Sequence, residues 1–137
     1  MSYPELIISC GLLAFVLIFP PLIAAIQSNG LQWAFGNRNI PADLPEWASR
    51  AQRAQRNTVD VLLPFAIILI GVQSAGVPPE QLLFGTALFF WSRVAYAIVY
   101  IIGIPYLRTA IFLAGVAGML SIARTVLPIP NPGALFM

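Results

Sequence analysis

Four segments rich in apolar residues determine which folds are open to this chain. Each has at least about 20 residues, and they run over about 6–26, 46–75, 80–103 and 105–125. Because an α-helix rises 1.5 Å per residue, about 20 residues cross the roughly 30 Å hydrocarbon core of a bilayer. Only 9% of the 137 residues are charged, compared with about 25% in a typical soluble domain. The sequence therefore predicts an all-α integral membrane protein, with a bundle of four transmembrane helices forming one domain over 1–137.

The first of these spans contains two consecutive prolines. Pro20 and Pro21 lack backbone N–H donors, so we expect this helix to kink toward its second end. A basic region before an apolar run is typical of a cleaved signal peptide, but residues 1–5 contain no Lys or Arg. We therefore expect the segment to be retained as a span.

The connections between the spans predict how the helices pair. Residues 29–49 form the one sizeable loop, and its aromatic residues are expected at headgroup level, with a ligand contact as the alternative. These aromatic residues are Trp33, Phe35 and Trp47. The Val-Pro-Pro connection over 77–79 is so short that the second and third helices should be antiparallel neighbours. Gly115 and Gly118 give the fourth helix a small-residue face suited to close contact, and the proline-rich tail over 127–133 should be extended.

Arginine is the only basic residue type in the chain. There are seven Arg, no Lys and no His, and the net charge of +2 does not suggest nucleic-acid binding. A guanidinium grips carboxylates at two points and stays charged when partly buried, so an all-Arg set fits anion binding at a membrane interface. Codon bias is the alternative explanation for the missing Lys. With no His and one cysteine, Cys10, the sequence has no recognisable metal site and no internal disulfide, and Cys10 is expected to be a packing residue.

The distribution of arginine predicts the orientation of the protein in the membrane. Five arginines lie on the side that holds the 29–50 loop and the turn into the fourth helix, whereas Arg124 lies on the other side. By the positive-inside rule, the loop is cytoplasmic and both termini are periplasmic. We expect a protein of this kind in a bacterial inner membrane.

A polar stripe runs along the second predicted helix. Its residues are spaced by three and four, which places them on one face; they are Arg50, Arg53, Asn57, Asp60 and Pro64. The stripe continues into an apolar span, where ionisable groups usually face a bundle interior or a wet cavity and indicate a functional site. The alternative for the arginines is an orienting role with contacts to lipid headgroups.

The third predicted helix has a polar face of its own, formed by Arg93, Tyr96 and Tyr100. A lone Arg within a span needs an acid or a wet cavity, and Asp60 is the one acid of the second span. We therefore predict a contact between Arg93 and Asp60, either at a ligand site or as a structural pair that pins two helices. Tyrosines at such positions also serve as anchors at the membrane interface.

The stripe of the second helix, the polar face of the third and Arg108 at the start of the fourth should meet at the cytoplasmic half of the bundle. Together they bring positive charge, one carboxylate, one amide and two phenols, but no nucleophile–base pair. Such a set predicts a site that holds an anionic ligand and polarises a group that the ligand itself brings.

Two motifs in these segments match a known family. The run Arg53-Ala-Gln-Arg-Asn-Thr-Val-Asp60, followed by Pro64-Phe65, resembles the second-helix motif of MAPEG proteins, the membrane-associated proteins in eicosanoid and glutathione metabolism. The run Arg93-Val-Ala-Tyr-Ala-Ile-Val-Tyr100, followed by Gly103-Ile-Pro-Tyr-Leu-Arg108, is similar to that family's third helix and the turn into its fourth. The resemblance covers nearly the whole chain in length, number of spans and order of motifs.

The resemblance implies a homotrimer of four-helix subunits that binds glutathione between neighbouring subunits near the cytoplasmic face. The residues expected to bind glutathione are Arg50, Arg53, Arg56, Asn57, Asp60, Arg93 and Tyr96, and those expected to act on its thiol are Arg108 and Tyr100. Two positions depart from the family pattern. Asp60 stands where Glu is usual, and Tyr96 stands where one branch has His, which argues against that branch's prostaglandin chemistry.

The resemblance and the charge pattern lead to two alternative functions. The first is a glutathione-dependent transferase or peroxidase, in which a guanidinium lowers the pKa of the glutathione thiol and the thiolate attacks a lipophilic electrophile from the bilayer. The second is a non-catalytic membrane scaffold, or a subunit of a larger membrane complex, that keeps the fold without the chemistry. Thiol-dependent turnover distinguishes the two.

Overall fold

The computed structural model describes residues 1–128, and within them the chain is helical and contains no strand. The helices are α1 Tyr3–Val16, α2 Phe19–Asn29, α3 Leu31–Phe35, α4 Glu46–Ser74, α5 Pro79–Ile102 and α6 Pro105–Ala123. With α1 and α2 taken together, four of the described segments are long and apolar enough to cross a membrane. The predicted all-α fold with four spans is therefore confirmed.

The first span is interrupted rather than kinked. α1 ends at Val16 and α2 begins at Phe19, one residue before the two prolines. Because Pro20 and Pro21 have no N–H, they cannot donate to the carbonyls one turn earlier. At this point the hydrogen bond reaches back three residues instead of four, from the Ile18 N–H to the Phe15 carbonyl at 3.1 Å. The break lies near the middle of the span, earlier than the kink that the sequence predicts.

The other helix boundaries follow the turn residues of the sequence. α4, α5 and α6 each begin directly after or at a proline, where the missing N–H costs no helical bond. α5 ends at Ile102 and is capped by Gly103, whose φ of +95° suits a residue without a Cβ. The 29–49 loop is shorter than expected, because Leu31–Phe35 forms the small helix α3 between Gly30 and Gly36. The predicted extended tail over 127–133 falls mostly outside the described residues.

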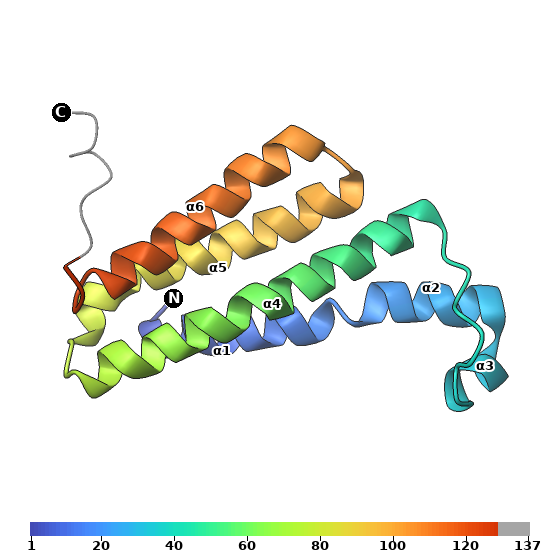
Figure 1. Ribbon diagram of the computed structural model, residues 1–137, viewed down its shortest axis with the longest axis horizontal. Helices are drawn as coiled ribbons and strands as arrows, with labels where there is room; N and C mark the ends of the chain where they lie inside the picture. Colours follow the sequence, from blue (N-terminus) through green and yellow to red (C-terminus); the bar gives the residue numbers. More distant parts are fainter. Residues whose placement is uncertain (129–137) are drawn as a thin grey trace.

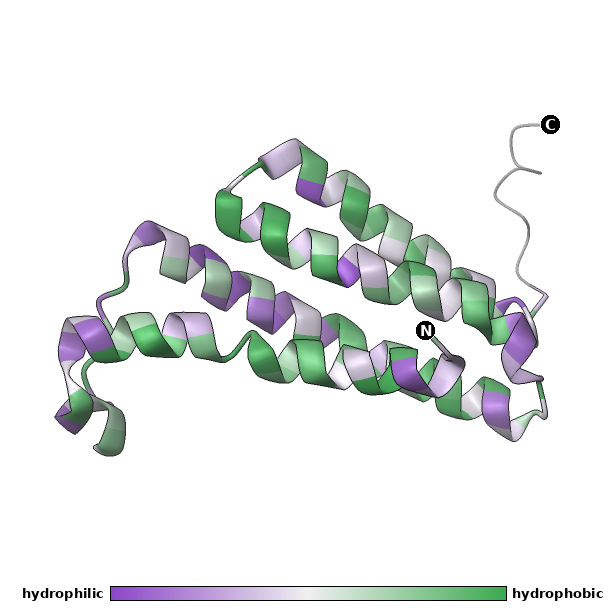
Figure 2. Cartoon of the chain, turned by 180° about the vertical axis from the view of Figure 1, so that it is seen from behind, coloured by the Kyte–Doolittle hydropathy of each residue, from purple (hydrophilic) through white to green (hydrophobic). Residues whose placement is uncertain are grey.

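The helices form an elongated bundle in which α4 lies along α1 and α2 (Figure 1). α5 packs against α1, α4 and α6, whereas α2 packs against α3 and α4. The 36–45 connection and the α5–α6 turn lie at one end of the bundle, and the α4–α5 turn lies at the other. The 29 residues of α4 span about 44 Å, about 14 Å more than the apolar layer, so one end of α4 extends beyond it. Figure 2 shows hydrophilic residues gathered on the N-terminal half of α4 and around α3.

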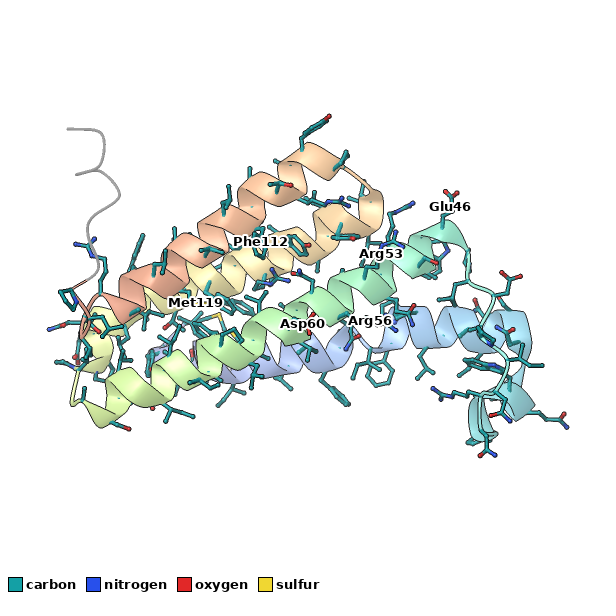
Figure 3. All side chains as sticks on the ribbon, in the orientation of Figure 1. Glu46, Arg53, Arg56, Asp60, Phe112 and Met119 are labelled. Atoms are coloured by element: carbon teal, nitrogen blue, oxygen red, sulfur yellow. The ribbon has the colours of Figure 1, made fainter. Side chains whose placement is uncertain are left out.

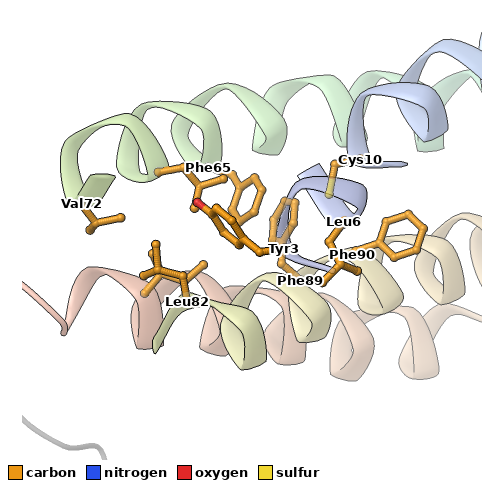
Figure 4. Close-up of a cluster of buried hydrophobic side chains, with 10 residues drawn as sticks. Tyr3, Leu6, Cys10, Phe65, Val72, Leu82, Phe89 and Phe90 are labelled. Carbon is orange, nitrogen blue, oxygen red and sulfur yellow. The ribbon is translucent and has the colours of Figure 1, made fainter. Parts of the chain in front are cut away.

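The apolar core lies between α1, α4 and α5, with one residue from α6 (Figure 4). Phe65 of α4 stacks on Phe89 of α5 with ring centroids 3.8 Å apart. Cys10 is buried in this cluster, as expected of a packing residue, and Tyr3 accepts a hydrogen bond from the amide of Gln73. Many large apolar residues remain exposed on the outer faces of the helices, which suits contact with lipid or with another polypeptide.

The closest helix contact is between α5 and α6. Gly118 of α6 faces Gly85 of α5 so closely that a Cβ on Gly118 would lie 2.8 Å from the Gly85 carbonyl oxygen. Gly115 lies on the same buried side of α6. The prediction that the small-residue face of this helix makes a close contact is confirmed.

Candidate functional site

Three predicted site residues from three helices meet around the Tyr100 side chain. Arg53 of α4 donates from Nε to the Tyr100 hydroxyl at 3.3 Å, and its guanidinium carbon lies 5.9 Å from the ring centroid. The guanidinium carbon of Arg108, in the first turn of α6, lies 4.5 Å from the same ring. Tyr100 therefore sits between two cations, and its ring can stabilise both. The three motifs that the sequence analysis singled out lie at one end of the bundle, as predicted.

Arg93 has neutral partners instead of the predicted acid. This side chain is 2% exposed, and its Nη2 donates to the Asn57 Oδ1 at 2.7 Å and to the Thr58 hydroxyl at 3.0 Å. The guanidinium carbon also lies 4.3 Å from the centroid of the Tyr96 ring. Within the described residues, the Nε and Nη1 of Arg93 have no hydrogen-bond partner.

The predicted contact between Arg93 and Asp60 is wrong for the subunit. Asp60 is exposed and makes no ion pair within the described residues. The physical reason is helix rotation: Asp60 lies about 200° around α4 from Thr58, and Thr58 is the residue that faces α5. Sequence reasoning missed Thr58. A signal was present, since Thr58 recurs at helical spacing with the buried residues Ala51, Ala54 and Phe65.

A small hollow opens beside these residues, with a volume of about 210 Å³. Its lining comes from α4, α5 and α6 and consists of Asn57, Tyr96, Arg108, Thr109 and Phe112. The Asn57 Oδ1 accepts from Arg93, so the amide NH₂ group is free to serve a ligand. The Tyr96 ring packs against Tyr100 and Phe112 at centroid distances of 5.5 and 6.1 Å. The hollow therefore combines a cation, an amide donor and an aromatic wall.

The remaining predicted site residues lie outside this hollow. Arg50 donates from Nε to the Ile101 carbonyl at 3.0 Å, at the C-terminal end of α5, where a cation is favourable. It also forms a long ion pair of 4.0 Å with Glu46. Arg56 and Asp60 are exposed, and Figure 3 labels both along α4 together with Arg53. Among residues 1–128, no cluster of His, Cys, Asp or Glu could hold a metal ion.

The comparison with protein families decides the identity of the chain. The model of the MAPEG family matches residues 6–127, a range that includes every residue of this site. The chain belongs to the MAPEG family. It is thus a membrane protein of the family associated with glutathione and eicosanoid metabolism. No curated protein and no solved structure matches this MAPEG protein.

Proposed function

We propose that this MAPEG protein is a glutathione-dependent membrane transferase or peroxidase that acts on lipophilic electrophiles. The observation that supports this most is the cationic hollow between α4, α5 and α6. Arg108 and Asn57 line it, Asn57 accepts from Arg93, and Arg53 donates to Tyr100 beside it. Within the described residues, none of these three arginines is paired with a carboxylate. An anionic ligand would therefore meet positive charge that the subunit itself leaves uncompensated.

Glutathione carries two carboxylates, one ammonium group and a thiol, which match the chemistry of the site. Guanidinium groups of Arg53 and Arg56 and the amide of Asn57 suit the carboxylates, and Asp60 suits the ammonium group. Arg108, together with the N-terminal N–H groups of α6, favours a thiolate over a thiol because it supplies positive potential. Tyr100 lies beside Arg108, and its hydroxyl can donate a hydrogen bond to the sulfur.

The reaction needs no nucleophile from the protein. The thiol releases its proton to water, the sulfur forms a bond to an electrophilic carbon, and the leaving group departs with the bonding electrons. With a lipid hydroperoxide, the sulfur instead attacks the terminal oxygen, the O–O bond breaks, and the lipid alkoxide leaves and takes a proton to become the alcohol. A second glutathione thiol then attacks the sulfur of the resulting sulfenic acid, which forms the disulfide and releases water. Both substrates are apolar molecules that reach the site from the bilayer.

A homotrimer with the site at the cytoplasmic end fits the same observations. Ligand pockets typically measure about 300–1,000 Å³, whereas the hollow of one subunit measures about 210 Å³. A neighbouring subunit placed against α4 would enlarge it and would cover Arg56 and Asp60, which are exposed on the subunit. The positive-inside rule assigns this arginine-rich end to the cytoplasm.

The test is glutathione binding to the purified protein in detergent, followed by thermal unfolding. A ligand at about 100 times its dissociation constant adds about 2.7 kcal/mol to the free energy of unfolding, which raises the unfolding temperature measurably. We expect the shift to disappear in Arg53→Gln and to persist in Arg124→Gln, a matched exposed arginine on the far side of the bundle. No shift at high millimolar glutathione, or an equal shift in both variants, would refute the assignment.

A scaffold function remains the second candidate, because part of the predicted set serves the fold. Arg50 caps the end of α5, and Arg93 joins α4 to α5 through Asn57 and Thr58. Conjugation of glutathione to a chlorodinitrobenzene, followed by absorbance, separates the candidates. Turnover that is lost in Arg53→Gln supports the enzyme, whereas an absence of turnover with several electrophiles supports the scaffold.

A further inference from the structure

A second hollow, with a volume of about 360 Å³, lies between α2, the 36–45 connection and α4. Its polar lining is formed by Arg38, Gln52 and Gln55. Part of its apolar wall is formed by Ile18, directly before α2, and by Pro21 and Leu22 of α2. It shares no lining residue with the hollow beside Asn57. Gln55 and Asn57 are two residues apart, so they point about 200° away from each other around α4. The two hollows are therefore separate sites on opposite faces of one helix.

Arg38 is held at the mouth of this hollow by several contacts. Its φ is +54°, and it is the one residue other than glycine with a positive φ in the described part of the chain. Its Nε donates to the Ala34 carbonyl at 3.2 Å, and its guanidinium carbon lies 5.1 Å from the centroid of the Trp33 ring. The indole N–H of Trp33 donates to the Ile40 carbonyl at 2.7 Å, which fixes the ring. A strained backbone that persists under such contacts commonly marks a functional position.

The contacts of Arg38 leave the outer part of its guanidinium group for a ligand. Only Nε has a hydrogen-bond partner among residues 1–128, so both Nη groups can donate. Gln52 and Gln55 add amide donors on the α4 side of the same space. Phosphate oxygens are the acceptors that suit such a set, because Arg binds them at two points and amides can donate to the remaining oxygens.

The position of the hollow in the bundle indicates where the phosphate comes from. The polar lining lies at the end where α4 extends beyond the apolar layer, and Trp33 is of the type found at headgroup level. This part of the apolar wall lies at the start of α2, the second half of a predicted span, and Ile18, which directly precedes α2, is 42% exposed. A molecule that fills the hollow therefore needs an anionic head at the surface and an apolar chain that follows α2 into the bilayer.

We propose that this hollow binds an anionic phospholipid, with its phosphate on Arg38, Gln52 and Gln55 and an acyl chain along α2. Basic pockets between transmembrane helices commonly take anionic headgroups. The site is independent of the glutathione proposal, since the two share neither residues nor ligand chemistry. Binding at this site would bring the 36–45 connection into contact with a lipid headgroup.

The test is native mass spectrometry of the detergent-purified protein with added phosphatidylglycerol or diacylglycerol, which has the same acyl chains but no phosphate. We expect phosphatidylglycerol to bind at least about tenfold more tightly, in line with the strength of a charged hydrogen bond. The preference should vanish in Arg38→Asn, which removes the charge but keeps a residue type that tolerates positive φ. It should persist in Arg38→Lys and in Arg124→Asn, the control on the far side of the bundle.

Three outcomes would overturn the proposal. The first is equal binding of the two lipids by the unaltered protein, and the second is an unchanged preference in Arg38→Asn. The third is displacement of phosphatidylglycerol by millimolar inorganic phosphate, which would assign the hollow to a soluble phosphate compound instead. Gln55→Leu provides a second variant should Arg38→Asn fail to fold, and it should weaken phosphatidylglycerol binding about tenfold without affecting diacylglycerol binding.

Discussion

Substitution of Gly118 by Ala tests whether α5 and α6 cross as closely as the structure shows. The added Cβ would lie 2.8 Å from the Gly85 carbonyl oxygen and 3.0 Å from the Phe89 amide nitrogen. Ordinary contacts of a Cβ begin near 3.4 Å, so about half an ångström is missing at two places. Both obstacles are backbone atoms within a helix, which cannot rotate away as a side chain can. The two helices therefore have to separate.

The expected cost follows from measured overpacking in protein cores, which is typically about 1–3 kcal/mol. Ala is also the better helix former, by about 1 kcal/mol in an exposed helix interior. The control variants Gly71→Ala and Gly115→Ala bring the same gain in helix propensity without a backbone clash. A Cβ on Gly71 would meet nothing within 4 Å, and one on Gly115, on α6 itself, would lie at an ordinary 3.4 Å from the Ser92 Cβ. We therefore expect Gly118→Ala to be about 1–3 kcal/mol less stable than either control.

The assay is chemical unfolding in detergent micelles, followed by far-ultraviolet circular dichroism, for the three variants in parallel. The result also bears on function, because the α5–α6 crossing sets the position of Arg108 relative to Tyr96 and Tyr100. Equal unfolding midpoints for Gly118→Ala and Gly115→Ala would refute the reasoning, since they would show that the glycine pair does not limit the approach of the helices.

Two further predictions concern the site itself. Thr58→Val keeps the shape of the side chain but removes the hydroxyl that accepts from Arg93. The buried Nη2 of Arg93 then loses one of its two acceptors, so the free energy of unfolding should fall by about 1–3 kcal/mol; an unchanged unfolding midpoint in the same assay would contradict the buried contact. Arg108→Met removes the cation beside Tyr100. The pKa of the bound glutathione thiol should therefore rise, and the plot of turnover against pH should move to higher pH. A profile that stays in place while turnover falls uniformly would show that Arg108 only positions the ligand.

The architecture could be predicted from the sequence because it depends on local signals. The length of the apolar runs indicates the four spans. Residues such as Pro45, Pro105 and Gly103 indicate where the helices begin and end, because they restrict or permit particular backbone conformations. The helix α3 was missed although Gly30 and Gly36 bracket it, because a five-residue helix gives no periodic pattern. The two prolines of the first span indicated roughly where its helix is disrupted. They did not show whether the helix would bend or break, because that depends on how the carbonyl groups without an N–H partner are accommodated.

The site could be predicted as a set of residues but not as a set of contacts. Helical spacing correctly grouped Arg53 and Asn57 on one stripe, but it does not fix how far α4 is rotated against α5. That rotation directs Thr58 rather than Asp60 toward Arg93. The hollow beside Arg38 was beyond sequence reasoning for a different reason, since it arises where an irregular connection folds back on two helices.

The interruption between α1 and α2 ties the folding of the subunit to its surroundings. The carbonyls of Val16 and Leu17 would pair in an uninterrupted helix with the N–H groups of residues 20 and 21, which are prolines. Leu17 lies about 21 Å along the axis from Tyr3, within the thickness of the apolar layer. Hydrocarbon cannot satisfy a carbonyl group, and of the two residues Val16 is exposed on the subunit whereas Leu17 is buried. Water drawn into the bilayer or a donor from a neighbouring polypeptide must therefore serve the Val16 carbonyl, so an isolated subunit in lipid carries a solvation penalty that an assembled one can relieve.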